Sequence, residues 1–518
     1  MSSINSTEHG EQLARNRAIS SDQPLSFQSP RVSALPFTLI GLILAIASAL
    51  AINFTATISS YLVVGAALGV IVTVIIFQKP EVGAYILIFT VFTNLSDLFT
   101  ENGFPSINKP LVGIVIFSIF ANYILKTGKI NTSARITRAE VALIVYYLTI
   151  LISTLVAVNQ SKSLLAIIDL TKDIAVGICI YLTLDTKEKL KTGVRVLLVT
   201  VTFVSILGVI HTLSDATLTF WGLARESAFG QVGGSGGLRY GGPIAESNVW
   251  GQILVSILPI ALYQMAKTRD LPAKMIPASA ALFILLAMLF TESRGAVLAL
   301  ILASLLIAID LRIKATSLFG IASIGFLLLL ILPSQYTERI MTLDIIFTGN
   351  QEYGYSQDGA VEGRREKMLT GLAMFRENPF LGVGFANYSD NYWSYAGNLG
   401  LEADARDINA ENSARLPHSL YIEIMAETGI FGISSFLAFM GFILSGLYQA
   451  RKKYHSKKNK AAQNWPIWVA SIMMSILTFL IAGFFLHGIG FRFIWVLSGL
   501  ALVSIHLSKN PSSLSKIN

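Results

Sequence analysis

The sequence predicts an all-α fold, a polytopic bundle of transmembrane helices with one large extracytoplasmic loop. Of its 518 residues, 53% are apolar and only 14% are charged, and the mean hydropathy is +0.62. Soluble globular domains carry far more charge, so this composition argues against a soluble fold. Apolar runs of about 17 to 25 residues recur along the chain, each long enough to cross a hydrocarbon core of about 30 Å as a helix.

About fourteen such runs are expected to form transmembrane helices. They fall near 34–53, 58–77, 81–98, 110–126, 139–158, 164–184, 193–213, 244–265, 272–291, 294–310, 316–333, 419–449, 466–486 and 490–507. Residues 1–33 are polar and rich in serine, so we expect a disordered cytosolic tail and no cleavable signal peptide. The single cysteine, Cys179, lies in an apolar run, so we expect no disulfide and no thiolate metal site.

The short loops between these runs carry most of the basic residues. When both termini are placed in the cytosol, every strongly basic short loop faces the cytosol, as the positive-inside rule requires. The basic residues of these loops are Lys126, Lys129, Arg135, Arg138, Lys187, Lys189, Lys191, Arg195, Lys267, Arg269, Lys274, Arg312, Lys314 and the run from Arg451 to Lys460. The net charge of +8 is therefore explained by topology, and we expect no nucleic-acid partner.

The same orientation places three polar segments on the outer face of the membrane. They are the loop at 214–243, the tight turn at 292–294 and the long loop at 334–418. Nucleoside triphosphates and sugar nucleotides are scarce outside the cytoplasm. Any reaction at these segments must therefore use an already activated substrate that the membrane delivers.

The first outer loop is rich in glycine. Residues 230–243 combine seven glycines with Arg239, so backbone N–H groups can approach an anion while the guanidinium grips it. The segment lacks the ending of a P-loop, and a flexible re-entry loop is the alternative. Glu246, Asn248 and Gln252 follow at the start of the next apolar run, where polar side chains are costly unless they serve a site.

Arg294 stands between two apolar runs with almost no loop around it. Its guanidinium lies at the outer membrane surface or points into the bundle. One interpretation is an interfacial anchor that reaches the lipid headgroups. The other is an anion ligand shared with Arg239, because Gly295 would leave exposed the start of a helix, which favours anions.

His418 follows Pro417 and opens an apolar helix. A helix N-terminus disfavours the imidazolium ion, so the ring stays neutral and can act as a base near pH 7. Glu423 and Glu427, four residues apart on one helical face, could orient this site or pair with the arginines. The sequence Glu-Thr-Gly at 427–429 could equally mark only a kink.

Two other constellations compete with this site. The carboxylates of Glu402, Asp404 and Asp407 could hold a divalent cation, although an acidic solvated loop explains them without a metal. Within the expected helix at 164–184, Asp169, Lys172 and Asp173 have the spacing of mutually paired charges. Ionisable groups inside a membrane helix would suit a transporter.

Several motifs, in their order along the chain, resemble the O-antigen ligase family, which also includes O-antigen and exopolysaccharide polymerases and some protein O-oligosaccharyltransferases. The motifs are Ser-Arg-Gly-Ala at 293–296, the run from Gly363 to Leu372, Glu-Asn-Pro at 377–379, Gly-Val-Gly at 382–384 with Phe-Ala-Asn-Tyr after it, Pro-His-Ser-Leu-Tyr at 417–421 and Glu-Thr-Gly at 427–429. The resemblance covers roughly residues 235 to 440.

The resemblance implies a GT-C-type glycosyltransferase of the bacterial inner membrane that uses no metal, cofactor or nucleotide sugar. It implies a glycan on undecaprenyl diphosphate as donor, a glycan or lipid A-core as acceptor, surrounding membrane lipid, and a chain-length regulator and a flippase as partner proteins. The implied roles are diphosphate binding by Arg239, Arg294 and Arg364, and deprotonation of the acceptor hydroxyl by His418 with inversion of the anomeric carbon. Glu423, Glu427 and Asn248 would support this site.

The expected organisation has three parts after the tail: N-terminal transmembrane helices at 34–213, a catalytic region at 214–449, and a basic cytosolic loop with the last two helices at 450–518. The motifs do not separate a ligase from a polymerase or a protein O-oligosaccharyltransferase, but no appended periplasmic acceptor domain is visible, which favours the first two. A polysaccharide or lipid flippase is the alternative of another class, and it would predict inverted internal repeats that the sequence does not display.

Overall fold

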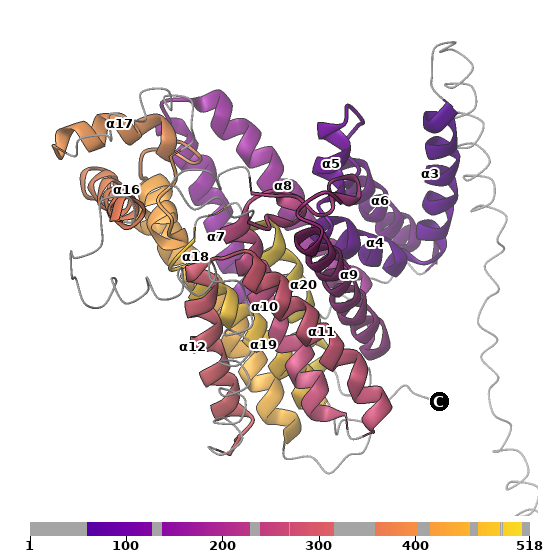
Figure 1. The fold of residues 1–518 in the computed structure, drawn as a ribbon. Helices are drawn as coiled ribbons and strands as arrows, with labels where there is room; N and C mark the ends of the chain where they lie inside the picture. Colours follow the sequence, from indigo (N-terminus) through magenta and orange to yellow (C-terminus); the bar gives the residue numbers. More distant parts are fainter. Residues whose placement is uncertain are drawn as a thin grey trace, which may run out of the picture. The chain divides into compact units, whose positions relative to one another are not determined.

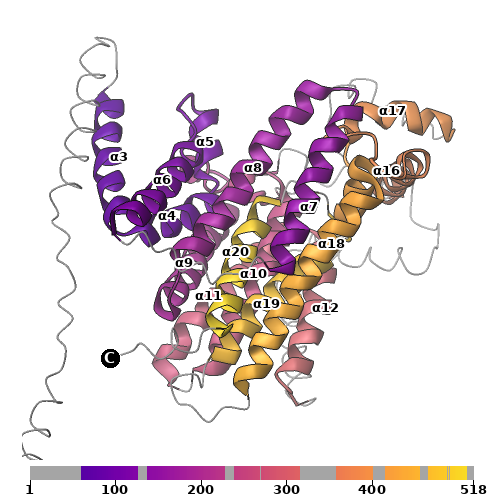
Figure 2. The same cartoon turned by 180° about the vertical axis from the view of Figure 1, so that it is seen from behind.

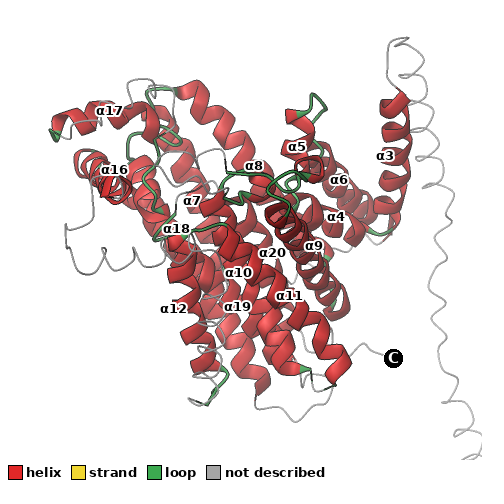
Figure 3. Ribbon diagram, in the orientation of Figure 1, coloured by secondary structure: helices red, strands yellow, loops and turns green. Residues whose placement is uncertain are grey.

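The computed structural model describes residues 60–126, 137–227, 239–268, 270–314, 358–400, 415–455, 465–486, 488 and 491–509. This part of the chain is helical (Figure 3), and its only β-pairing is one isolated bridge between Glu226 and Tyr240. Residues 1–74 and 75–518 form two separate compact units. The described part of the first unit is the beginning of α3 (Ser60–Gln78). The all-α prediction is confirmed for these residues.

The second unit contains the remaining helices. They are α4 (Pro80–Phe92), α5 (Leu95–Glu101), α6 (Asn108–Lys126), α7 (Arg138–Ser153), α8 (Gln160–Thr183), α9 (Lys187–Leu213), α10 (Ser247–Lys267), α11 (Leu271–Phe290), α12 (Arg294–Asp310), α16 (Asp358–Glu377), α17 (Tyr388–Asn398), α18 (Leu420–His455), α19 (Trp465–Ala482) and α20 (Phe491–Lys509), with short 3-10 turns at Thr154–Val156, Phe220–Gly222 and Gly242–Ile244.

Within the described residues, eight helices are long and apolar enough to cross a membrane: α6, α7, α9, α10, α11, α18, α19 and α20. The protein is thus a multi-pass membrane protein, although fewer helices pass this test than the fourteen expected. At 17 residues α12 is short, and α8 carries Lys162, Asp169, Lys172 and Asp173. The expected tail at 1–33 and the expected spans at 34–53 and 316–333 lie outside the described residues.

One expected span is not a single helix. The run 81–98 was expected to cross the membrane unbroken, but the structure divides it into α4 and α5, which are bent by 61°. Asn94 causes the break, because it adopts a left-handed conformation with φ 52°. Its side-chain Nδ2 donates to the Pro243 carbonyl at 3.1 Å. A tertiary hydrogen bond therefore stabilises a turn that the apolar pattern conceals.

The bundle is built around α10 and α19, which pack against each other and bury most of their residues. Helices α11 and α12 pack beside α10, and α18 packs between α7 and α19. The two opposite views in Figures 1 and 2 show these helices running roughly alongside one another. Bulky apolar side chains of the central pair, such as Trp250 and Phe479, are almost completely buried, as expected when two helices form a common core.

The chain alternates in direction, so the bundle has two distinct ends. The motif end contains the beginnings of α8, α10, α12, α18 and α20 together with α16 and α17, and it is the upper end in Figure 1. The basic end contains the beginning of α9 and the last turns of α10, α12 and α18. Lys187, Lys267 and Arg451 lie at the basic end, which matches the side that the basic loops were expected to share.

Helices α16 and α17 lie within the expected loop at 334–418. The first packs against α18 and the second packs mainly against α16. A methyl group placed on Gly371 of α16 would meet Ile422 and Tyr388, so the absence of a side chain at Gly371 lets α16 approach the head of α18 closely. This part of the expected loop is therefore a helical platform at the motif end.

Candidate functional site

Arg239 connects the first outer segment to the turn between α11 and α12. Its Nε and Nη2 donate to the Thr291 carbonyl at 3.2 and 3.0 Å, and Nη2 also donates to Asn248 Oδ1 at 3.3 Å. The carboxylate of Glu292 lies 3.9 Å from Nε, and both side chains are largely buried. Arg239 thus positions the turn that leads directly into Arg294, and it brings one positive charge to that turn.

Glu246 organises the beginning of α10. Its carboxylate accepts hydrogen bonds from the backbone N–H groups of Asn248 and Val249 at 3.3 and 2.6 Å, and from Asn248 Nδ2 at 3.1 Å. These contacts satisfy N–H groups that a helix start otherwise leaves without partners. Asn248, expected to support the site, therefore links the Glu246 cap to the Arg239 guanidinium.

Arg364 comes from a separate helix and faces the same cap. Burial lowers the pKa of the Arg364 guanidinium, and the nearby Glu246 carboxylate opposes that shift. An arginine remains protonated under either influence. Arg364 and Gly371 are two helical turns apart and share a face of α16, so the positive charge of Arg364 lies on the side of α16 that meets α18.

Arg294 is the first residue of α12. The Ser293 hydroxyl caps this helix by accepting from the Ala296 N–H at 3.3 Å, and Glu292 turns the chain with φ 49°. A methyl group on Gly295 would lie 2.8 Å from Cβ of Phe485, so the start of α12 packs tightly on the turn that follows α19. The expected tight turn at 292–294 is confirmed.

His418 lies two residues before the first residue of α18 and adopts a left-handed backbone conformation, with φ 51°. Such a conformation is uncommon outside glycine and often occurs at functional sites. Three contacts fix the following helical turns: the Leu420 N–H donates to Gly483 O at 2.8 Å, the Tyr421 hydroxyl donates to Leu480 O at 2.6 Å, and the Glu423 carboxylate accepts from the Gly488 N–H.

These contacts bring His418 and Arg294 to the same turn. The head of α18 is hydrogen-bonded to Gly483, and the head of α12 packs on Phe485. These anchoring positions are two residues apart in the chain. The structure therefore places Arg239, Arg294, Arg364 and His418 on elements at the motif end that contact one another.

Glu427 binds the segment that leads into α17. Its carboxylate accepts hydrogen bonds from the N–H groups of Ala386 and Tyr388 at 2.9 and 3.1 Å, and its backbone carbonyl accepts from Gly384 N–H at 3.2 Å and from the Ser153 hydroxyl at 2.6 Å. The hydrogen bonds described for the Glu423 and Glu427 carboxylates are thus with backbone N–H groups. Both glutamates hold loops in place against α18.

The Glu-Thr-Gly motif forms a kink in α18, and this kink allows α18 to form backbone hydrogen bonds with a neighbouring loop. Gly429 has φ 65° and ψ −161°, a conformation that essentially only glycine adopts. The break frees backbone groups, so Ile430 N–H donates to Pro379 O at 2.7 Å and Val383 N–H donates to Ala426 O at 2.8 Å. The motifs at 377–379, 382–384 and 427–429 therefore form one backbone clasp.

Sequence reasoning missed a polar cluster that joins α17 to α8. The Asn387 side chain is completely buried. Its Oδ1 accepts from the Asn159 N–H at 2.7 Å, and its Nδ2 donates to the Ser163 hydroxyl at 2.8 Å. Lys162 and Asp390 form an ion pair beside it. The order of the residues offered no signal, because Asn159 and Asn387 are 228 positions apart.

The structure also places an aromatic group above the clasp. The Arg415 guanidinium lies 5.3 Å from the centre of the Trp393 ring and 6.0 Å from that of Tyr392. Burial raises the pKa of Tyr392, the charge of Glu366 raises it further, and Arg415 opposes both. The aromatic spacing in Tyr388–Asn398 was the available signal for this cluster.

Of the two competing groups of charged residues, the structure describes only the second. Glu402, Asp404 and Asp407, together with the glycines at 230–237, lie outside the described residues. Among the residues described, no group of three or more His, Cys, Asp or Glu side chains could hold a metal ion. Asp169, Lys172 and Asp173 do pair, at 3.4 and 3.5 Å, with Lys109 3.6 Å from Asp169.

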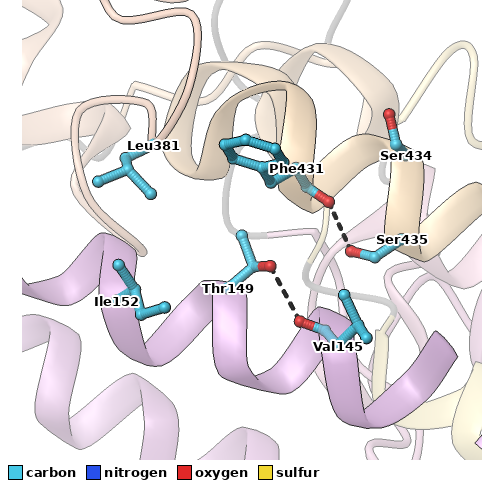
Figure 4. A pocket seen from close by; sticks show the side chains of 7 residues that line it. All are labelled: Val145, Thr149, Ile152, Leu381, Phe431, Ser434 and Ser435. Carbon is cyan, nitrogen blue, oxygen red and sulfur yellow. Dashed lines mark hydrogen bonds between the residues drawn. The ribbon is translucent and has the colours of Figure 1, made fainter. Parts of the chain in front are cut away.

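An apolar groove runs beside the clasp between α7 and α18 (Figure 4). Its volume is about 530 Å³, and it is lined by Val145, Thr149, Ile152, Leu381, Phe431, Ser434 and Ser435. The hydroxyls of Thr149 and Ser435 donate to carbonyls of their own helices at 2.9 and 2.6 Å. The wall is therefore effectively apolar, as suits a surface in contact with lipid chains.

Residues 279–437 match the family model described as O-antigen ligase. This segment is therefore similar to the O-antigen ligase family. The matched O-antigen ligase segment extends from α11 into α18 and contains Arg294, Arg364, His418 and Glu427. Arg239 and Asn248 precede it. A search of curated proteins gave no match.

Similarity to the O-antigen ligase family over this segment suggests a membrane enzyme of the glycosyltransferase type, with a glycan donor and an acceptor. The geometry at the motif end is compatible with that chemistry. Guanidinium groups and the starts of α10 and α12 bring positive charge to one place. A histidine lies at the head of a third helix nearby.

Proposed function

We propose that the protein transfers a glycan from undecaprenyl diphosphate to an acceptor hydroxyl on the extracytoplasmic face of the bacterial inner membrane. The observation that carries this proposal is the gathering of Arg294, Arg364 and His418 from three helices at one end of the bundle. All three lie inside the segment that matches the O-antigen ligase model.

In this proposal the arginines stabilise the leaving diphosphate. Negative charge grows on the bridging and terminal oxygens as the bond to the sugar breaks, and fixed guanidinium groups in a partly dry site lower the energy of that state. Arg294 and Arg364 approach from separate helices. Arg239 adds its charge while its hydrogen bonds to Thr291 and Asn248 hold the turn that carries Arg294.

His418 accepts the proton of the acceptor hydroxyl as the oxygen attacks the anomeric carbon. A single displacement by this oxygen, opposite the departing diphosphate, would invert the anomeric centre. The charge needed for departure comes from guanidinium groups, so the proposed mechanism involves no metal ion or nucleotide sugar. The rigid head of α18 keeps the imidazole at a fixed position, which proton transfer requires.

The acceptor would determine which type of enzyme the protein is. A lipid A-core acceptor makes it a ligase, a second lipid-linked glycan makes it a polymerase, and a protein serine or threonine makes it an oligosaccharyltransferase. We propose surface polysaccharide assembly, by ligation or polymerisation, with a flippase and a chain-length regulator as the accompanying proteins. The basic end would face the cytosol, and both termini would lie there.

The deciding experiment is transfer of a labelled undecaprenyl-diphosphate glycan by the purified full-length protein in EDTA, with each acceptor class supplied separately. We expect His418→Ala to reduce the rate by about 10²- to 10⁴-fold and Arg294→Ala by about 10²- to 10³-fold. Arg312→Ala is the matched control, because Arg312 lies just beyond the other end of α12, and it should transfer at the wild-type rate.

The outcomes separate the claims. Undiminished transfer by folded His418→Ala and Arg294→Ala would overturn the assignment of the site. A wild-type protein that transfers to no acceptor class would overturn the proposed function. Retained configuration in the product linkage would contradict single displacement through His418.

A further inference from the structure

A row of positive charge lies at the basic end of α9, far from the candidate site. Lys191 and Arg195 are spaced four residues apart and so form one short row along the helix. The same row continues with Val199 and Phe203, whose side chains are 64% and 43% exposed. One face of α9 therefore changes from cationic at its end to apolar and exposed along its length.

Lys267, at the end of α10, joins this row. Helices α9 and α10 contact each other, and the charges of Lys191 and Arg195 both act on the Lys267 ammonium group. The Glu188 carboxylate, which accepts a hydrogen bond from Lys191 at 2.8 Å, offsets part of this charge. Three cations thus lie near one another at the basic end.

The neighbouring Lys189 shows that this convergence is not a general property of α9. Its ammonium group lies 2.8 Å from the Asp185 carboxylate and 3.5 Å from that of Glu81. Lys189 therefore belongs to a neutralised face of the helix, two residues away from each of Lys187 and Lys191. The face with Lys191 and Arg195 carries two cations against the one carboxylate of Glu188, so it keeps a positive charge.

Two buried hydrogen-bond donors lie near Lys267. The Lys267 ammonium group stands 4.9 Å above the centre of the Trp468 ring, and Gln264 precedes Lys267 by three residues on the same helix surface. Within the described chain, Trp468 Nε1 and Gln264 Nε2 are buried and have no hydrogen-bond acceptor. Buried donors normally have a partner, so both point to a missing acceptor.

The apolar surroundings of the cluster are also exposed. Helix α9 packs beside α11, and the first two turns of α11 expose Leu271, Met275 and Ile276, with 67% to 76% of each residue accessible. These side chains and those of Val199 and Phe203 offer an apolar surface next to the cations. A ligand that satisfies both parts has an anionic head and long hydrocarbon chains.

We propose that the cluster of Lys191, Arg195 and Lys267 is a binding site for the phosphate headgroup of an anionic phospholipid of the surrounding membrane. Its acyl chains lie along the exposed apolar side chains of α9 and α11. Basic groups between membrane helices are suited to such headgroups. The site is independent of the glycosyl-transfer site and of the function proposed for it.

The test measures lipid-dependent thermal stabilisation and lipid retention, by native mass spectrometry, of the full-length protein in a neutral detergent. The probes are phosphatidylglycerol, phosphatidylcholine and inorganic phosphate. We expect phosphatidylglycerol alone to bind and stabilise. Since each cation near an anionic surface contributes about fivefold in affinity, the double variant Lys191→Gln/Lys267→Gln should bind it roughly twentyfold more weakly.

The matched control is Lys189→Gln/Lys452→Gln, which removes the same charge from the neutralised face of α9 and from exposed Lys452 on α18. It should keep the wild-type affinity. Glu188→Gln, which removes the opposing carboxylate, should bind several-fold more tightly, and it serves as a test even if the double variant fails to fold. Equal weakening in the control, an unchanged affinity in Glu188→Gln, or the same stabilisation by inorganic phosphate would overturn the proposal.

Discussion

The candidate site and the basic cluster both gather positive charge, but they do so with different side chains. The candidate site uses Arg239, Arg294 and Arg364, and Arg239 holds carbonyl and amide oxygens at 3.0 to 3.3 Å. Two of the three cations in the basic cluster are lysines. An arginine presents donors in a rigid planar fork, whereas a lysine acts as a point charge on a flexible stem.

The surroundings of the two regions differ in the same way. At the motif end, the Glu427 carboxylate and the carbonyls of residues 426 and 427 fix loops through backbone hydrogen bonds. At the basic end, the exposed carboxylate of Glu188 forms an ion pair with Lys191. The difference teaches that chemistry on a substrate needs fixed geometry, while a headgroup site needs charge and apolar surface.

The largest effect should come from the clasp. Gly429→Ala would place a methyl group 2.2 Å from Phe380 O in a conformation that alanine avoids, so we expect a loss of more than about 4 kcal/mol of stability and no folded site. Gly441→Ala in the same helix meets nothing within 4 Å and should leave thermal unfolding unchanged. A Gly429→Ala protein that unfolds with Gly441→Ala at the same temperature would refute the clasp.

A smaller effect is expected from removing one carboxylate. Glu427→Ala leaves the buried N–H groups of Ala386 and Tyr388 without their acceptor, which should cost about 3 kcal/mol. Glu188→Ala, at the basic end, should change stability by less than about 0.5 kcal/mol because its ion pair is exposed. Thermal unfolding in one detergent measures both. Equal shifts would show that the two ends do not differ in this respect.

The smallest effects are expected from substitutions that preserve the charge. Arg294→Lys should reduce transfer by about ten- to a hundredfold, because an ammonium group cannot reproduce bidentate contact with a diphosphate. Lys267→Arg should keep phosphatidylglycerol binding within about twofold, because a headgroup site that reads charge accepts either cation. Transfer rates and lipid affinity are the two readouts, and an Arg294→Lys enzyme with the wild-type rate would remove the distinction between the ends.

The sequence predicted the residues of the candidate site but not the contacts that their side chains make. Arg294 and His418 were singled out because each opens an apolar helix, and the structure brings those two helix heads to one turn. Glu423 and Glu427 were expected to orient the site or meet the arginines. Their described contacts are backbone N–H groups from segments distant in the chain, which no local pattern records.

The sequence by itself determined the membrane-spanning character, the approximate positions of most described helices and the separation of basic from polar loops, because these follow from local apolar length and charge. It also determined which side chains could bind an anion or accept a proton. Only the tertiary structure decided that Asn94 breaks an apolar run and that Asn387 joins α17 to α8. It also decided that Lys267 of α10 lies near the cations of α9. Each depends on contacts between residues far apart in the chain, whose geometry exists only after the helices pack.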